Sequence, residues 1–219
     1  MATFVLIHGA GGRASDWDLV SAALRAAGHD TVAVDLPCDD DAAGLAEYVD
    51  AVVDALGGHR TDLVVVAQSL GGLTAPLVAD RVPVELIVLV TAMIPKPGET
   101  GGDWWANTGH AVAPGLPDNS DETLFTHDVP PDVLEAAGPS RDQSGTPMEE
   151  PWPLAAWPDV PTRFLLCMDD RFFPPEWMRG VVHDRLGTQP DEIPGSHCAY
   201  LSQPKPMAAA ILQAWADLT

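Results

Sequence analysis

Short, unbroken runs of Val, Ile and Leu recur along the chain and alternate with helical patterns. Strands that are covered on both faces show such runs without polar alternation, which is typical of a parallel sheet between two layers of helices. The alternation predicts the doubly wound α/β class, in which ligands bind beyond the carboxyl ends of the strands. The expected strands are Thr3 to Ile7, Thr31 to Val34, Leu63 to Ala67, Leu86 to Val90 and Arg163 to Cys167, with a weaker sixth near Glu192.

Helical patterns fill the first two gaps between these runs. We expect the first helix to begin with Ser15 as its N-cap and to end at Gly28, where a residue with positive φ is needed. The second repeats apolar residues at helical spacing from Leu45 to Leu56, before a pair of glycines. Each helix returns the chain to the start of the next strand.

The alternation breaks between Pro95 and Pro161, in a stretch rich in Pro, Gly and Asp that holds four of the seven tryptophans. This stretch is too long for an ordinary connection and too aromatic for a disordered linker. We therefore predict an α/β core of residues 1–94 and 159–219, with a small cap insertion, residues 95–158, folded over the carboxyl edge of the sheet. One helix is expected in the cap, near Asp121 to Ala137.

Composition restricts the function classes. A chain of 219 residues, 46% of them hydrophobic, can bury one substantial core. The formal net charge of −21 repels nucleic acid phosphates and anionic lipid surfaces. Three widely spaced cysteines without a C-x-x-C pattern suggest neither a disulfide framework nor a zinc site. The charge leads us to expect no nucleic acid or membrane partner. Because the N-terminus lacks a basic region and no run approaches ~20 apolar residues, we also expect a cytoplasmic protein.

The stretch "VVVAQSLGG" places Ser69 between an expected strand and a helical pattern, which is the context of a nucleophilic serine on a sharp turn. The usual motif, G-x-S-x-G, is met only in part, because Ala67 replaces the first glycine. Small residues are nevertheless present on both sides of the serine. A serine that merely caps a helix would fit the same stretch.

A serine hydroxyl becomes a useful nucleophile only when a base takes its proton, and histidine has a suitable pKa. His197 follows the weak last strand and precedes the C-terminal helix, so it is expected at the same sheet edge as Ser69. It is the preferred base. Of the other histidines weighed, His29, His59 and His183 lie at or inside helix ends and are expected to be solvated, and His110 and His127 lie in the cap.

An acidic residue after another strand would complete the set, because it would orient the imidazole. Asp169 and Asp170 both follow the strand that ends at Cys167, and spacing alone leaves both open. The glycine-rich loop "HGAGG" after the first strand can bring backbone N–H groups close to a ligand. We expect Ala10 and Leu70 to supply two oxyanion-hole donors. The alternative, a phosphate cradle, does not match known nucleotide-binding spacings.

These segments together resemble the α/β-hydrolase superfamily over essentially the whole chain. They are the His8-Gly9-Ala10 loop, "AQSLGG" around Ser69, "DDRFFPPEW" from Asp169 and "SHCAYLSQP" from Ser196. The resemblance is strongest to the small plant methylesterase and hydroxynitrile lyase group and its bacterial esterase relatives. In that group the acidic residue lies three positions before an F-x-P-E-aromatic segment, here beginning at Phe173, and this selects Asp170.

The resemblance also separates activities within the group. The lyases have a threonine after the first-strand histidine and a lysine after the catalytic histidine, whereas this chain has Gly9 and Cys198. The resemblance therefore implies a carboxylic ester hydrolase. We expect it to act on a small-molecule ester without cofactor or metal, as a monomer or homodimer. A hydroxynitrile lyase or lactonase on the same scaffold, and a non-catalytic binding protein with this fold, are the alternatives.

Aromatic residues of the cap and of the loop after Asp170 are candidates for the substrate pocket. Packing of the cap against the sheet would explain each of them equally well. The candidates are Trp104, Trp105, Phe125 and Phe172.

Overall fold

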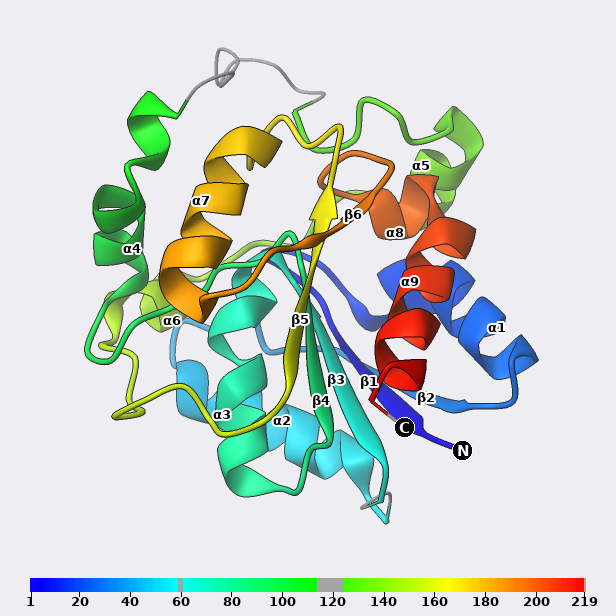
Figure 1. Ribbon diagram of the computed structural model, residues 1–219, viewed down its shortest axis with the longest axis horizontal. Helices are drawn as coiled ribbons and strands as arrows, with labels where there is room; N and C mark the ends of the chain where they lie inside the picture. Colours follow the sequence, from blue (N-terminus) through cyan, green and yellow to red (C-terminus); the bar gives the residue numbers. More distant parts are fainter. Residues whose placement is uncertain (59–60, 114–123, 219) are drawn as a thin grey trace.

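The computed structural model describes residues 1–58, 61–113 and 124–218. Within these ranges, six strands form one wholly parallel sheet in the order β2-β1-β3-β4-β5-β6 (Figure 1). The predicted α/β class is confirmed, and the five strands with predicted bounds lie within one residue of them. The strands are β1 (Thr3–Ile7), β2 (Asp30–Val34), β3 (Leu63–Gln68), β4 (Leu86–Val90), β5 (Thr162–Cys167) and β6 (Asp191–Ile193).

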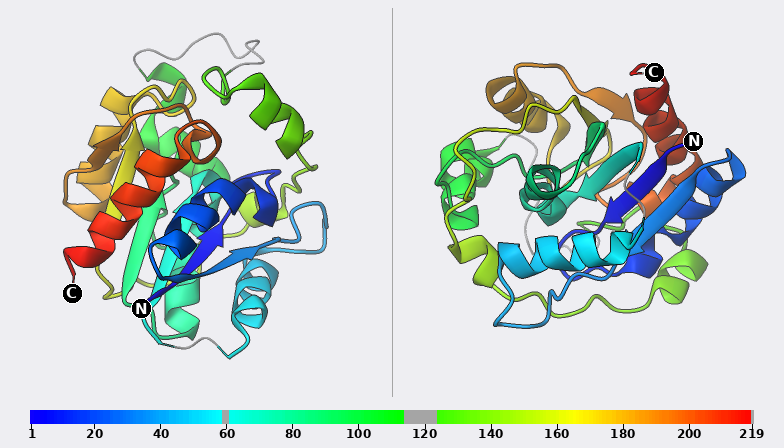
Figure 2. Two further views of the ribbon diagram at one scale, coloured as in Figure 1. Left: turned by 90° about the vertical axis from the view of Figure 1, so that its right-hand side faces the viewer. Right: turned by 90° about the horizontal axis from the view of Figure 1, so that it is seen from below.

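Helices cover both faces of the sheet (Figure 2). One face packs on α1 (Asp18–Ala26) and α9 (Pro204–Ala216), and the other on α2 (Leu45–Leu56), α3 (Ala75–Arg81) and α7 (Pro175–Leu186). Alternate residues of each strand enter different cores, so that Leu6 joins the first and Ile7 the second. This two-sided burial explains the unbroken apolar runs. In the described ranges, every helix is too short or too polar to cross a membrane.

The first helix begins later than predicted. Ser15 is not its N-cap, because a 3-10 turn, η1 (Ala14–Trp17), comes first and α1 starts at Asp18. The Asp16 carboxylate accepts the Arg13 N–H at 2.9 Å and so provides a hydrogen-bond partner for the backbone at the start of the turn. The end was predicted more closely, since Ala27 caps the helix and Gly28 follows with a φ of +91°.

The insertion between β4 and β5 crosses the carboxyl edge of the sheet (Figure 1). It contains α4 (Gly101–Thr108), the 3-10 turn η3 (His110–Val112), α5 (Pro131–Ala137) and α6 (Thr146–Glu149). The prediction of one helix in the insertion, near Asp121 to Ala137, is wrong in number, because the described residues form α4, α5 and α6, and it is also wrong in extent. Residues 124–130 form turns, the helix starts only at Pro131, whose ring suits a first helical turn, and residues 121–123 lie outside the described residues.

Candidate active site

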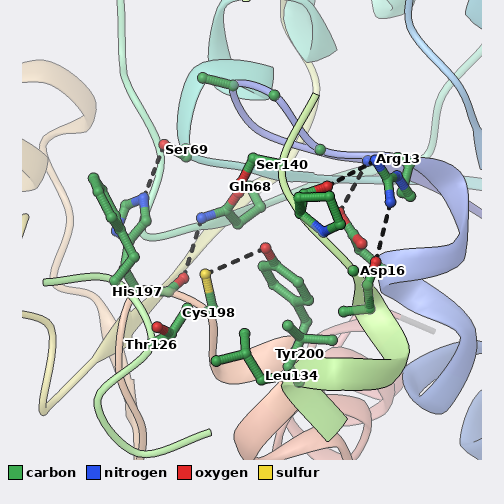
Figure 3. Close-up of a pocket in the computed structure, with 18 of the residues that line it drawn as sticks. Arg13, Asp16, Gln68, Ser69, Thr126, Leu134, Ser140, His197, Cys198 and Tyr200 are labelled. Carbon is green, nitrogen blue, oxygen red and sulfur yellow. Dashed lines mark hydrogen bonds between the residues drawn. The ribbon is translucent and has the colours of Figure 1, made fainter. Parts of the chain in front are cut away.

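Three side chains from distant parts of the sequence meet at the carboxyl edge of the sheet. Ser69 directly follows β3, Asp170 follows β5, and His197 lies between β6 and α8 (Ala199–Ser202). His197 Nε2 lies 2.9 Å from Ser69 Oγ (Figure 3), and His197 Nδ1 lies 2.8 Å from Asp170 Oδ2. All three residues are buried. The structure thus brings together the predicted nucleophile, base and acid.

The hydrogen-bond network determines which ring nitrogen of His197 carries the proton. A carboxylate oxygen only accepts, so Nδ1–H donates to Asp170 and the lone pair of Nε2 faces the Ser69 hydroxyl. This tautomer can accept a proton from the serine.

Asp170 is held by further donors besides the imidazole. The Thr91 hydroxyl donates to Oδ2 at 2.6 Å, and the N–H groups of Phe172 and Phe173 donate to Oδ1, each at 2.9 Å. These bonds fix the orientation of the carboxylate. The neighbouring Asp169 is exposed, and its carboxylate accepts the Gly195 N–H, two residues before His197.

Ser69 has a φ of +52°, a left-handed conformation that is uncommon for a residue with a side chain. The 3-10 turn η2 (Ser69–Leu73) starts at this residue. The glycines that follow are required by close backbone contacts, because a Cβ on Gly71 would lie 2.9 Å from His8 O and one on Gly72 would overlap Met93 O. Ser69 therefore occupies a strained and tightly enclosed turn, as a nucleophile elbow requires.

His8 supports the loop that follows β1. Its Nε2 accepts the Leu36 N–H at 3.0 Å, so Nδ1 carries the proton and donates to Gly9 O at 2.7 Å. Burial lowers the pKa of His8, which favours this neutral form. No role for this side chain was predicted from the sequence, because its partner lies after β2.

The backbone N–H groups of this loop differ in what they bond. Those of Gly11, Gly12 and Arg13 donate to Gln143 Oε1, Gly9 O and Asp16 Oδ2 respectively. For the Ala10 N–H, no acceptor is found among the described residues. The Leu70 N–H lies in the first turn of η2, where a helix leaves its N–H groups without helical acceptors. Ala10 and Leu70 are the two residues that were predicted as oxyanion donors.

Ser69 and His197 line a cavity of about 840 Å³, bounded also by the loop after β1 and by the cap (Figure 3). Phe125 and Phe172 form its wall beside the histidine, with ring centroids 5.5 and 5.1 Å from that of His197. Arg13 lies on the opposite side of the cavity from His197 (Figure 3). Its guanidinium donates to two backbone carbonyls of the cap.

Charge in the cavity does not favour anions. The charged residues among its described lining are Arg13, Asp16 and Glu135. Burial raises the pKa of Asp16. One arginine with two acidic side chains offers no net positive charge to an anionic substrate.

The two predicted tryptophans lie outside this lining. Trp104 is fully buried in the core and donates its indole N–H to Ile94 O at 3.0 Å. Trp105 packs on Phe172 and Phe173, with ring centroids 5.6 and 5.8 Å away. For both, the structure shows the packing role that the sequence left open. Phe125 and Phe172 are the predicted pocket residues that reach the cavity.

Within the described ranges, the other histidines that were weighed bond to groups other than Ser69. His110 and His127 donate through Nε2 to the carbonyls of Phe172 and Asp169. His183 is exposed, as predicted, but His29 is half-buried and accepts a backbone N–H, so its prediction as a solvated residue is wrong. His59 lies outside the described residues. Within the described ranges, no cluster of three His, Cys, Asp or Glu side chains could hold a metal ion.

Comparison with protein families matches residues 4–210 to the alpha/beta hydrolase family. A probable esterase of rice, PIR7A from Oryza sativa subsp. indica, is 28% identical over 96% of this chain and 95% of its own length. Methylesterase 7 of Arabidopsis thaliana is 38% identical over a shorter region, 42% of this chain and 40% of its own.

Solved structures show the same fold. A pyrethroid hydrolase from Sphingobium faniae JZ-2 superposes with a TM-score of 0.82 at 24% identity, covering 98% of this chain and 97% of its own. Polyneuridine aldehyde esterase superposes with a TM-score of 0.81 at 21% identity, covering 97% and 98%. At this level of identity the likeness establishes the architecture.

Proposed function

Because this chain belongs to the alpha/beta hydrolase family, we propose that it is a serine-dependent hydrolase of carboxylic esters. The observation that carries the proposal is the hydrogen-bonded series from Ser69 through His197 to Asp170 in the wall of a cavity. Relatives named as esterases, one of them aligned over 95% of its length, support an ester as the bond that is cleaved.

In the proposed first step, Ser69 Oγ attacks the ester carbonyl carbon while His197 Nε2 takes the hydroxyl proton. The bond to the alcohol then breaks as Nε2 returns that proton to the leaving oxygen. Asp170, held by Thr91 and two backbone N–H groups, stabilises the imidazolium that forms between these events. A water molecule activated by His197 cleaves the acyl-enzyme, releasing the acid and restoring Ser69.

The negative charge on the carbonyl oxygen requires donors that are already in place. We assign this role to the N–H groups of Ala10 and Leu70, which flank Ser69 from the loop after β1 and from η2. Among the described residues, the N–H groups of Gly11, Gly12 and Arg13 have acceptors and that of Ala10 has none, so the Ala10 N–H can donate to a substrate. Fixed donors of this kind stabilise the tetrahedral intermediate without reorganisation.

The shape and charge of the cavity indicate the substrate. A volume of about 840 Å³ accommodates an ester much larger than an acetate, and the rings of Phe125 and Phe172 provide an apolar wall. Arg13 is outnumbered by the acidic side chains of the lining, which favours neutral esters over anionic ones. Division into an α/β core, residues 1–94 and 159–219, and a cap, residues 95–158, is part of this proposal, since the cap supplies Phe125.

The lyase alternative requires a cation beside the histidine that can hold cyanide. Here Cys198 occupies the position after His197, and burial raises the pKa of its thiol to about 12. The thiol is therefore neutral at physiological pH and supplies no positive charge. This observation favours ester hydrolysis.

A fluorophosphonate probe tests the proposal directly, because it phosphonylates only a serine that a base activates. We expect the probe to label the wild type at Ser69, and mass spectrometry of the labelled peptide would locate the site. Ser69→Ala and His197→Ala should both be labelled much more slowly than the wild type. Absence of labelling, or labelling of another serine in both variants, would contradict the assignment.

A further inference from the structure

A segment of the cap is bound to the loop after β1, on the side of Ser69 where Ala10 lies. Gln143 Oε1 accepts the Gly11 N–H at 3.1 Å, and the Arg141 N–H donates to Gly11 O at 2.7 Å. Both polar groups of the Gly11 backbone are thus paired with the cap. Gly11 and Gln143 are 132 residues apart in the sequence.

Gln143 is itself held in a fixed orientation. Its Nε2 donates to the Tyr48 hydroxyl at 3.0 Å and to Ser144 O at 2.8 Å. Tyr48 lies in α2 and is buried in the core. The acceptor that Gln143 presents to Gly11 is therefore anchored to a rigid helix rather than to a free loop.

Gly11 is shaped for this contact. Its φ is +64°, and a Cβ at this position would lie 2.6 Å from Arg141 O. The close approach of the cap therefore depends on a glycine. The Gly11 N–H belongs to the Ala10–Gly11 peptide, so the contact restrains Ala10 from its carboxyl side, next to the Gly9–Ala10 peptide that carries the Ala10 N–H.

We propose that Gln143 is a positioning residue for the oxyanion hole: by accepting the Gly11 N–H, it holds the loop so that the Ala10 N–H is presented to the carbonyl oxygen at Ser69. The cap is then part of the catalytic apparatus and not only a cover for the substrate. This inference rests on the proposed ester hydrolysis, and it assigns to Gln143 no contact with the substrate.

The test uses Gln143→Leu, which keeps the size of the side chain and removes its hydrogen bonds. We expect kcat for a p-nitrophenyl ester to fall roughly 10- to 100-fold with KM changed less than about threefold, because only the transition state carries charge on the carbonyl oxygen. A trifluoromethyl ketone, which forms an oxyanion on Ser69, should lose affinity by the same factor. A competing product acid should bind as in the wild type.

Two further variants separate positioning from general damage to the cap. Thr146→Val removes the bond from Thr146 Oγ1 to Asp41 O, between cap and core, and also the acceptor of the Ser144 hydroxyl. It leaves the contact between Gln143 and Gly11 in place and should leave kcat unchanged. Tyr48→Phe loosens Gln143 and should lower kcat by a smaller factor. In the Gln143→Leu background it should have no further effect, because the two side chains act through one contact.

Ser69→Ala is measured in the same assay. If Ser69→Ala is inactive and Gln143→Leu keeps kcat within twofold, or if the ketone and the product acid weaken equally, the positioning role is overturned while ester hydrolysis stands. If Ser69→Ala retains turnover, the proposed function fails, and the role of Gln143 fails with it.

Discussion

The side-chain amide of Gln68 donates a hydrogen bond of 3.1 Å to the carbonyl oxygen of His197, and so joins the residue before the serine to the backbone of the histidine. Both residues are buried. Gln68→Met removes the donor and leaves a buried carbonyl without its partner, which costs about 1 to 3 kcal/mol. We expect kcat/KM for ester hydrolysis to fall about tenfold, and steady-state kinetics would show it. Unchanged turnover would mean that other contacts suffice to place His197.

Thr91 should influence the reaction through Asp170. Its hydroxyl donates to the carboxylate oxygen that also accepts from His197, and both residues are buried. Thr91→Val keeps the branched shape and should lower kcat/KM roughly 3- to 10-fold, since one hydrogen bond to a charged group is lost. Thr91→Ser retains the hydroxyl and should stay close to the wild type. Equal losses in the two variants would show that shape, and not the hydrogen bond, matters.

Gly72 should be irreplaceable for packing reasons. A Cβ there would overlap the Met93 carbonyl oxygen, a backbone atom that cannot turn away. We expect Gly72→Ala to lower the free energy of unfolding by about 1 to 3 kcal/mol in urea titration. Gly180 is the matched control, because it lies in α7 and a Cβ there would meet no atom of another element within 4 Å, so Gly180→Ala should stabilise by about 0.5 to 1 kcal/mol. A stable Gly72→Ala would refute the tight turn.

His8 should make stability depend on pH. Burial lowers the pKa of His8 in the folded protein below the ordinary 6.5 that applies in the unfolded chain. At a pH between the folded and the unfolded pKa, the unfolded chain therefore binds a proton that the folded chain does not. The stability due to neutral His8 is complete above pH 6.5 and declines as the pH falls from there toward the folded pKa. When the free energy of unfolding is measured in urea at pH 7.5 and at pH 5.5, it should fall more between the two for the wild type than for His8→Gln. An equal decline would contradict this account.

The sequence predicted the sheet closely because strands buried on both faces, such as β3, must be apolar at every position. It placed Ser69 and His197 at one edge for the same reason, since the carboxyl ends of parallel strands meet there. The choice of Asp170 over Asp169 needed the family resemblance. In the structure, Asp170 bonds His197, while Asp169 bonds Gly195.

The errors and the omissions have different physical causes. Ser15 and the cap helix were misplaced because capping and proline effects act within a few residues and compete there. Trp104 could not be assigned to core or cavity without the packing of α4. The supporting contacts of Gln68 and Gln143 span more than a hundred residues, and no local pattern announces them.

Hydrolysis of a p-nitrophenyl ester by Ser69→Ala, compared with the wild type, tests the central claim most directly. If Ser69 is the nucleophile, the wild type turns over the ester and kcat/KM of the variant falls on the order of 10⁴-fold or more. Circular dichroism should show that the variant keeps the fold of the wild type. Near wild-type turnover by Ser69→Ala would contradict the proposed mechanism.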